Sequence, residues 1–171
     1  MPEGDTVHRT ADRLHRALAG RVVERAELRW PRVPDVDLAG ARTLEVVARG
    51  KHLLHRIGDL TLHSHLKMEG RWDVYDRGGR WSRPAFQARA IVGTALHDTV
   101  GFDLADIALI PTSAEDTLVG HLGPDPLAED WDAAAAVARL QADTRPAHVA
   151  LLDQRNVAGF GNEYANEILF V

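Results

Sequence analysis

The segment from Val22 to Val100 has a mostly strand-like pattern, and this limits the fold more than any other feature of the chain. In its clearest stretch Leu60, Leu62, Ser64, Leu66 and Met68 alternate with Thr61, His63, His65, Lys67 and Glu69. Turn residues divide the segment into short pieces, at Pro31, Pro34, Gly40, Gly58, Gly78, Gly79 and Pro84. Several short alternating pieces with turns between them predict a β-sandwich or barrel.

A helix is expected before this segment. Asp5 or Thr6 can cap it, its apolar residues recur at spacings of three and four from Val7 to Leu18, and Gly20 ends it. One helix joined to many strands predicts an α+β fold.

The character of the chain changes near residues 123–126, so we expect one domain over residues 1–126 and a second, helical part over 127–171. Residues 130–140 predict a helix with acidic residues in its first turn. Pro146 can open a second helix, and residues 162–170 predict a third. The last one follows a glycine-containing turn, and a helix N-terminus there can present free N–H groups to a phosphate. Alone this signal is weak, since most such joints bind nothing.

Composition excludes several classes of protein. The 171 residues contain no cysteine, which excludes a disulfide framework and a thiolate metal site. No basic-then-apolar leader opens the chain, and no apolar run reaches the ~18 residues of a membrane span. We therefore expect a soluble cytoplasmic protein that does not contact a membrane.

Charge is distributed unevenly along the chain. Residues 1–97 contain 17 Lys and Arg against 12 Asp and Glu, a balance of +5, whereas residues 98–171 contain 3 against 13, a balance of −10. Such asymmetry is compatible with a first half that faces a polyanion such as nucleic acid. Two solvated faces of opposite sign would give the same pattern, and charge alone does not decide between them.

The first residues suggest a nucleophile. Removal of Met1 would leave Pro2 with a free secondary amine, whose pKa of about 8 leaves a useful fraction unprotonated at neutral pH. Such an amine attacks an aldehyde carbon and forms an iminium directly, and the neighbouring Glu3 could move protons. If Met1 stays in place, Pro2 is an amide nitrogen and this chemistry is lost.

Lysine is rare in the chain. Lys51 and Lys67 stand against eighteen arginines. Arginine stays protonated, whereas a lysine can give up its proton when burial lowers its pKa. A retained lysine in this background therefore indicates a chemical role, although two ordinary surface lysines are the simpler reading.

Histidines suggest an alternative. His63 and His65 lie two apart on a predicted strand and so share one face, and His52 and His55 precede them. Two histidines on one face can begin a metal site. No third ligand stands out, so surface or phosphate-facing side chains are the competing interpretation, and we assign no metal ligands.

Five motifs in order strengthen the nucleophile hypothesis. They are Met1-Pro2-Glu3-Gly4, then residues 49–54 (RGKHLL), 65–70 (HLKMEG), 121–127 (HLGPDPL) and 152–164 (LDQRNVAGFGNEY). Together they resemble the formamidopyrimidine-DNA glycosylase/endonuclease VIII family, closest to its actinobacterial endonuclease VIII members, over the whole chain. The resemblance implies an antiparallel β-sandwich with an N-terminal helix, followed by an incomplete helix–two-turn–helix segment.

The resemblance also implies a function in base excision repair. Pro2 would attack C1′ of a damaged nucleotide, Glu3 would assist ring opening and proton transfer, and Lys51 would act beside them. The partner would be damaged double-stranded DNA, with the target base flipped out of the helix. The residues expected to contact DNA are His65, Lys67, Met68, Glu69, His121 and Asn162. Of these, Met68 is expected to fill the gap left by the flipped base.

The sequence also departs from the family pattern. Residues 99–104 lack the Arg-Arg-Phe-Gly segment of the formamidopyrimidine branch, which favours the endonuclease VIII side and oxidised pyrimidines. Thr6 replaces a glutamate that many members carry. The zinc-finger ligands are absent, so we expect no cofactor in this chain. We read the chain as a monomeric bacterial, nucleoid-associated protein cut before the zinc finger, with a weakly active or inactive DNA-binding fragment as the alternative.

Overall fold

The computed structural model describes residues 2–171 and confirms an α+β fold built on two four-stranded antiparallel sheets. One sheet has the order β1-β6-β7-β5, and the other has the order β2-β3-β4-β8. The strands are β1 (Arg25–Leu28), β2 (Thr43–Arg49), β3 (His52–Ile57), β4 (Leu60–His65), β5 (Arg71–Asp76), β6 (Ala88–Gly93), β7 (His97–Phe102) and β8 (Asp106–Pro111).

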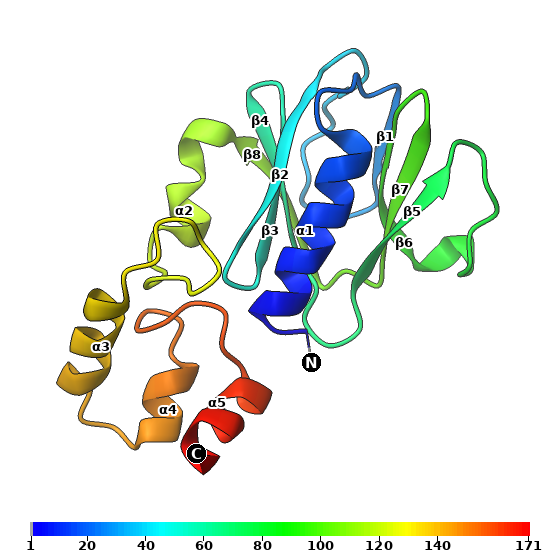
Figure 1. The fold of residues 1–171 in the computed structure, drawn as a ribbon. Coiled ribbons are helices and arrows are strands. Elements are labelled where there is room, and N and C mark those ends of the chain that lie inside the picture. The colour runs from blue at the N-terminus through cyan, green and yellow to red at the C-terminus, as the bar shows by residue number, and fades with distance from the viewer. Residues whose placement is uncertain (1) are drawn as a thin grey trace.

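Helix α1 (Gly4–Leu18) packs against strands of both sheets (Figure 1). Its buried face has the predicted spacing of three and four residues, and Gly20 follows it with a φ of +75°. The expected cap at Asp5 or Thr6 is wrong, because the helix begins earlier, at Gly4. The Gly4 N–H donates instead to the carbonyl of Gly159 at 2.9 Å, so a distant loop satisfies the helix start.

The alternating stretch of residues 60–69 forms a shorter strand than its pattern suggests. Strand β4 ends at His65, and Lys67 adopts a left-handed φ of +49° in the turn that leads to β5. Both faces of β4 are buried. Trp72 of β5 lies between the sheets and donates its indole N–H to the Ser64 hydroxyl at 3.0 Å, which satisfies a polar group inside the core.

The chain after β8 is helical. It contains the short helix α2 (Asp116–Val119), then α3 (Ala133–Ala142), α4 (Ala147–Leu152) and α5 (Asn162–Phe170); two 3₁₀ turns, Ala85–Gln87 and Thr112–Ala114, complete the regular structure. The second and third predicted helices are confirmed. The expectation of acidic residues inside the first turn of α3 is wrong, because Asp132 precedes the helix and caps it by accepting from the Ala135 N–H at 2.9 Å.

Register places the candidate residues at one end of the sandwich. His52 pairs with His65, and His65 pairs with Asp106, so the β2–β3 turn and the β4–β5 connection lie at the same edge. Figure 1 shows the start of α1 at this end, facing α4 and α5. No helix within residues 2–171 combines the length and the apolar character needed to cross a bilayer. The fate of Met1 lies outside the described residues.

Candidate active site

Three glycines bring distant segments into contact. Gly4 opens α1, Gly50 lies in the β2–β3 turn with a φ of +56°, and Gly159 lies before α5 with a φ of +96°. A methyl group on Gly4 would lie 2.9 Å from the Gly159 Cα, and one on Gly50 would lie 3.1 Å from the Ala158 Cβ. The close approach therefore requires glycine, and it joins Glu3, Lys51 and the turn before α5.

Glu3 is the centre of this junction. Its side chain is buried, with 3% of the residue exposed, and it enters the N-terminus of α5. The Gly161 N–H donates to one carboxylate oxygen at 2.7 Å and the Glu163 N–H donates to the other at 2.8 Å, while the Tyr164 N–H lies 3.4 Å away. A carboxylate in this position is favoured by the hydrogen bonds and by the helix dipole.

This arrangement corrects one expectation. The sequence offered the N–H groups at the start of α5 as a weak signal for phosphate binding, but those of Gly161 and Glu163 bind the carboxylate of the chain's own Glu3. The physical principle is the one used for the prediction, namely that a helix N-terminus attracts an anion. The prediction did not identify Glu3 as this anion, because the sequence gives no sign that residue 3 folds back over residue 161.

Lys51 lies beside the same helix start. A methyl group on Gly161 would lie 2.5 Å from a Glu3 carboxylate oxygen and 2.9 Å from Lys51 Nζ, so both side chains crowd this glycine. Burial lowers the pKa of the Lys51 ammonium, and the negative charge of Glu3 acts in the opposite direction. Burial therefore makes the neutral amine of Lys51 more accessible than that of an exposed lysine.

Pro2 precedes Glu3 directly and is half-buried. The contacts of Glu3 hold it at the start of α1, next to the segment that carries Gly159 and Gly161. The structure thus brings together the three residues expected to perform chemistry, Pro2, Glu3 and Lys51.

The β2–β3 turn is fastened to the linker that precedes the helices. Buried Asp125 accepts from the Gly50 N–H at 2.7 Å and from the Leu127 N–H at 3.0 Å. Arg49 donates to the Gly123 carbonyl at 3.2 Å. These bonds fix the position of the turn that carries Lys51. Asp125 was not among the expected site residues, although its motif was recognised.

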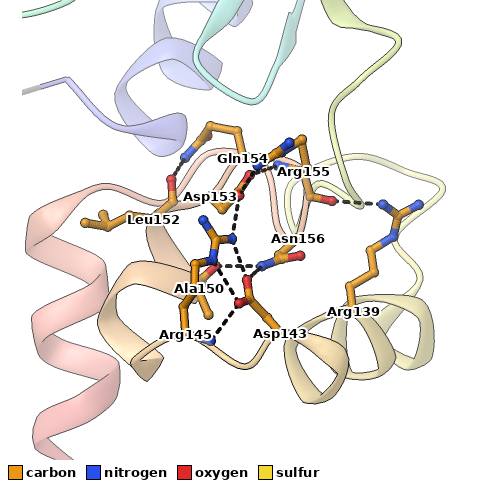
Figure 2. A network of polar contacts seen from close by, with 9 residues as sticks. All are labelled: Arg139, Asp143, Arg145, Ala150, Leu152, Asp153, Gln154, Arg155 and Asn156. Carbon is orange, nitrogen blue, oxygen red and sulfur yellow. Dashed lines mark hydrogen bonds and ion pairs between the residues drawn. The ribbon is translucent and has the colours of Figure 1, made fainter.

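A polar network holds the turn between α4 and α5 from its outer side (Figure 2). Asp153 accepts from the guanidinium groups of both Arg155 and Arg145 at 2.7 Å, and these bonds hold its pKa well below the usual range. Asn156 donates to Asp143 at 2.8 Å and to the Ala150 carbonyl at 3.0 Å. Part of the acidic charge in the second half of the chain is therefore used internally, by pairing with arginine.

Histidines gather beside Lys51. The rings of His52 and His63 are stacked with centroids 5.1 Å apart, and a 2.9 Å hydrogen bond joins His52 Nδ1 and His63 Nε2. His65 and His121 lie edge-on to His52, with centroid distances of 5.1 and 6.4 Å. His55 does not join this group, because it lies on the opposite face of β3, bonded to Thr43 at 3.0 Å. Among the described residues, no group of three or more histidine or acidic side chains is placed to hold a metal ion.

His65 is prepared to donate a hydrogen bond. The Lys67 N–H donates to His65 Nδ1 at 3.1 Å, so the neutral ring carries its proton on Nε2. Burial, followed by the positive charges of His63 and Lys67, lowers the pKa of His65 and favours this neutral form. A neutral imidazole with a fixed Nε2–H can donate to a phosphate oxygen.

The remaining predicted residues are exposed around this centre. Lys67, Met68 and Glu69 form the turn between β4 and β5, and 67% of Met68 is exposed. Asn162 is exposed at the first position of α5, directly after Gly161. An exposed thioether on a turn at the edge of the site has the access that a wedge between bases needs.

A cavity of about 220 Å³ lies at the same junction. Its lining is mostly apolar and comes from the start of α1, the linker and the turn before α5, including Asp5, Leu127, Phe160 and Tyr164. The rings of Phe160 and Tyr164 are stacked with centroids 6.4 Å apart.

Comparison with known proteins gives the family. Residues 122–171 match the model described as the formamidopyrimidine-DNA glycosylase H2TH domain. "Endonuclease 8 2" of Mycobacterium tuberculosis is 47% identical over 176 residues, covering the whole chain and 68% of that relative. The chain belongs to the formamidopyrimidine-DNA glycosylase/endonuclease VIII family. "Probable endonuclease 8 2" of Streptomyces coelicolor is 53% identical, and the chain spans 63% of its length.

Solved structures of the family share the fold. A complex described as that between the Lactococcus lactis Fpg and an abasic site containing DNA superposes with a TM-score of 0.77 at 28% identity, over 99% of this chain and 65% of that one. The endonuclease VIII/Fpg relationship therefore extends over the sandwich and the helices, including every segment that contributes to the junction around Glu3.

Proposed function

We propose that this chain carries the catalytic centre of a bifunctional DNA glycosylase and abasic-site lyase. The observation that supports it most directly is the position of the Glu3 carboxylate, held by backbone N–H groups of α5 between Pro2 and the partly buried Lys51. We assign catalysis to residues 1–126 and DNA binding to residues 127–171 together with the exposed edge of the sandwich.

The proposed first step is attack by the free Pro2 nitrogen on C1′ of the damaged nucleotide. The bond from C1′ to the base breaks, and the base leaves with the bonding electrons and takes up a proton. The amine then passes its proton to the Glu3 carboxylate, and Glu3 donates that proton to the ring oxygen as the bond from C1′ to this oxygen breaks. The product is an iminium, the Schiff base on Pro2.

Strand cleavage follows from this iminium. It acidifies the C2′ hydrogen, so removal of that proton expels the 3′ phosphate by β-elimination, and a second elimination releases the 5′ phosphate. Lys51 is near enough to Glu3 to act on the sugar or on a phosphate, and its lowered pKa favours proton transfer over a purely electrostatic role.

DNA binding is assigned to the groups around this centre. His65 offers an Nε2–H to a phosphate oxygen, His121 lies edge-on to the neighbouring His52, and Asn162 is exposed at the start of α5. Met68 is the proposed wedge, because an exposed, unbranched side chain can fill the space of an extruded base. Lys67 and Glu69 flank it. The DNA complexes among the related structures agree with such a partner.

The proposed substrates are oxidised pyrimidines in duplex DNA. The segment of residues 99–104 forms the end of β7 and the turn after it, without the two arginines that accompany recognition of purine lesions in the related branch. A site built to bond one base edge leaves buried groups unpaired when a different base is offered.

Borohydride trapping tests the proposal. Protein with Pro2 confirmed as its first residue by mass spectrometry is incubated with an abasic-site duplex and sodium borohydride, which reduces the iminium to a stable amine. A covalent complex is expected for the unchanged chain and a much slower one for Glu3→Gln. Failure of the unchanged chain to be trapped would favour the alternative, a DNA-binding fragment without activity.

A further inference from the structure

We infer that Gln154 is a positioning residue for Glu3. Gln154 lies after α4 and is half-buried. Its side-chain amide folds back onto its own loop, where the carboxamide oxygen accepts from the Gly159 N–H at 2.8 Å. The amide nitrogen donates to the Phe160 carbonyl at 2.8 Å and to the Leu152 carbonyl at 3.0 Å, the second of which is drawn in Figure 2.

The carboxamide thereby fixes the conformation of the turn before α5. It holds the backbone on both sides of the peptide bond between Gly159 and Phe160, where the left-handed φ of +96° at Gly159 has to be maintained. A flexible glycine turn has many alternative conformations, so three side-chain bonds to its backbone select one of them.

The selected conformation is the one that Glu3 requires. From this turn the Gly159 carbonyl accepts from the Gly4 N–H at 2.9 Å, and Gly161 directs its N–H to the Glu3 carboxylate at 2.7 Å. Within residues 2–171 the hydrogen bonds of the Gln154 side chain reach Leu152, Gly159 and Phe160 and not Glu3 or Lys51, so its effect passes through the backbone of residues 159–161. Gln154 binds the backbone of Gly159 and Phe160 from within its own loop, while Asp153 and Asn156 anchor the outer side of the turn.

Amide exchange tests this role without reference to activity. Hydrogen exchange at the N–H groups of Gly161 and Glu163, measured by NMR, should be accelerated about tenfold or more in Gln154→Ala, because the turn no longer holds these donors on Glu3. Gln141→Ala, on the exposed side of α3, is the matched control and should leave both rates unchanged. Unchanged exchange in folded Gln154→Ala would overturn the inference, whether or not the protein is active.

A double-mutant cycle tests the kinetic consequence, which rests on the proposed function. If Gln154 acts through Glu3, Gln154→Ala should slow borohydride trapping by about tenfold in the unchanged chain and by less than about twofold in a Glu3→Gln background. Equal losses in both backgrounds would show that Gln154 supports the fold and not the placement of Glu3. Absence of trapping in the unchanged chain would refute the glycosylase proposal and leave the exchange result to decide the role of Gln154.

The isosteric change Gln154→Glu provides a further readout. A carboxylate in place of the amide would face the carbonyls of Leu152 and Phe160 without a hydrogen to donate, whereas the protonated acid could donate to one of them. The trapping rate of Gln154→Glu relative to the unchanged chain should therefore rise as pH falls, and Gln141→Glu should show no such trend. A ratio independent of pH would contradict the proposed donor role of this amide.

Discussion

The substitution Gly161→Ala tests the junction around Glu3 most severely. The added methyl group would lie 2.5 Å from a Glu3 carboxylate oxygen, 2.7 Å from its carboxyl carbon and 2.9 Å from Lys51 Nζ. Gly161 has a φ of −130°, which alanine adopts without strain, so the cost comes from these contacts and not from the backbone. Lys51 can move its flexible end, but Glu3 is held in place by N–H groups of the same segment.

The magnitude follows from what must give way. Overpacking of this kind costs about 1–3 kcal/mol, and a hydrogen bond to a charged acceptor contributes about 1.5–3 kcal/mol. Relief of the clash is expected to displace Glu3 from one of its two short hydrogen bonds. The free energy that holds Glu3 in position then falls by about 3 kcal/mol, which corresponds to about a hundredfold slower trapping reaction.

Single-turnover trapping on abasic DNA measures this effect, together with the free energy of unfolding in urea. Gly40→Ala is the control, because its methyl group would enter open space while its φ of +87° still imposes backbone strain. We expect Gly40→Ala to lose stability and keep its trapping rate, and Gly161→Ala to lose trapping. A Gly161→Ala protein that is trapped within about twofold of the unchanged rate would refute the account of the Glu3 site.

Three further predictions concern other parts of the molecule. Lys51→Arg should cripple base excision while leaving the fold intact, since arginine keeps the charge but does not release a proton; unchanged single-turnover rates would make Lys51 purely electrostatic. Burial lowers the pKa of His55 to about 3, against an ordinary value of 6.5. The contribution of His55 to the free energy of unfolding is therefore complete well above pH 6.5 and declines as pH falls toward 3, by about 3 kcal/mol at pH 4.5. Urea titrations should show this slope, with a shallower one in His55→Asn. A version of the chain extended to the length of its relatives should release thymine glycol or 5-hydroxycytosine faster than 8-oxoguanine opposite cytosine in single-turnover assays. The reverse order of rates would place its specificity with the formamidopyrimidine branch.

Local patterns predicted much of the fold. The alternation of apolar and polar residues predicted strands, and Gly20 and Pro146 correctly marked helix boundaries, because these signals depend on neighbours in the sequence. The last strand, β8, lies beyond the segment from Val22 to Val100 for which the sequence predicted strands. The start of α1 could not be predicted, because its N–H partner is the carbonyl of Gly159.

The sequence predicted which residues form the site, but not the hydrogen bonds that join them to distant segments. Motifs led to Pro2, Glu3 and Lys51, but the binding of Glu3 to the start of α5 joins positions 158 residues apart. The supporting roles of Asp125 and Gln154 were missed for the same reason, since their partners are backbone groups of other turns. The spacing of three between His52 and His55 agrees with their positions on opposite faces of β3.

The identity of the atom that bonds to DNA tests the central claim most directly. Protein that begins with Pro2 is trapped on abasic DNA with borohydride, digested and mapped by tandem mass spectrometry. The account predicts a reduced adduct on the Pro2 nitrogen. An adduct on Lys51 or Lys67, with Pro2 unmodified, would contradict it.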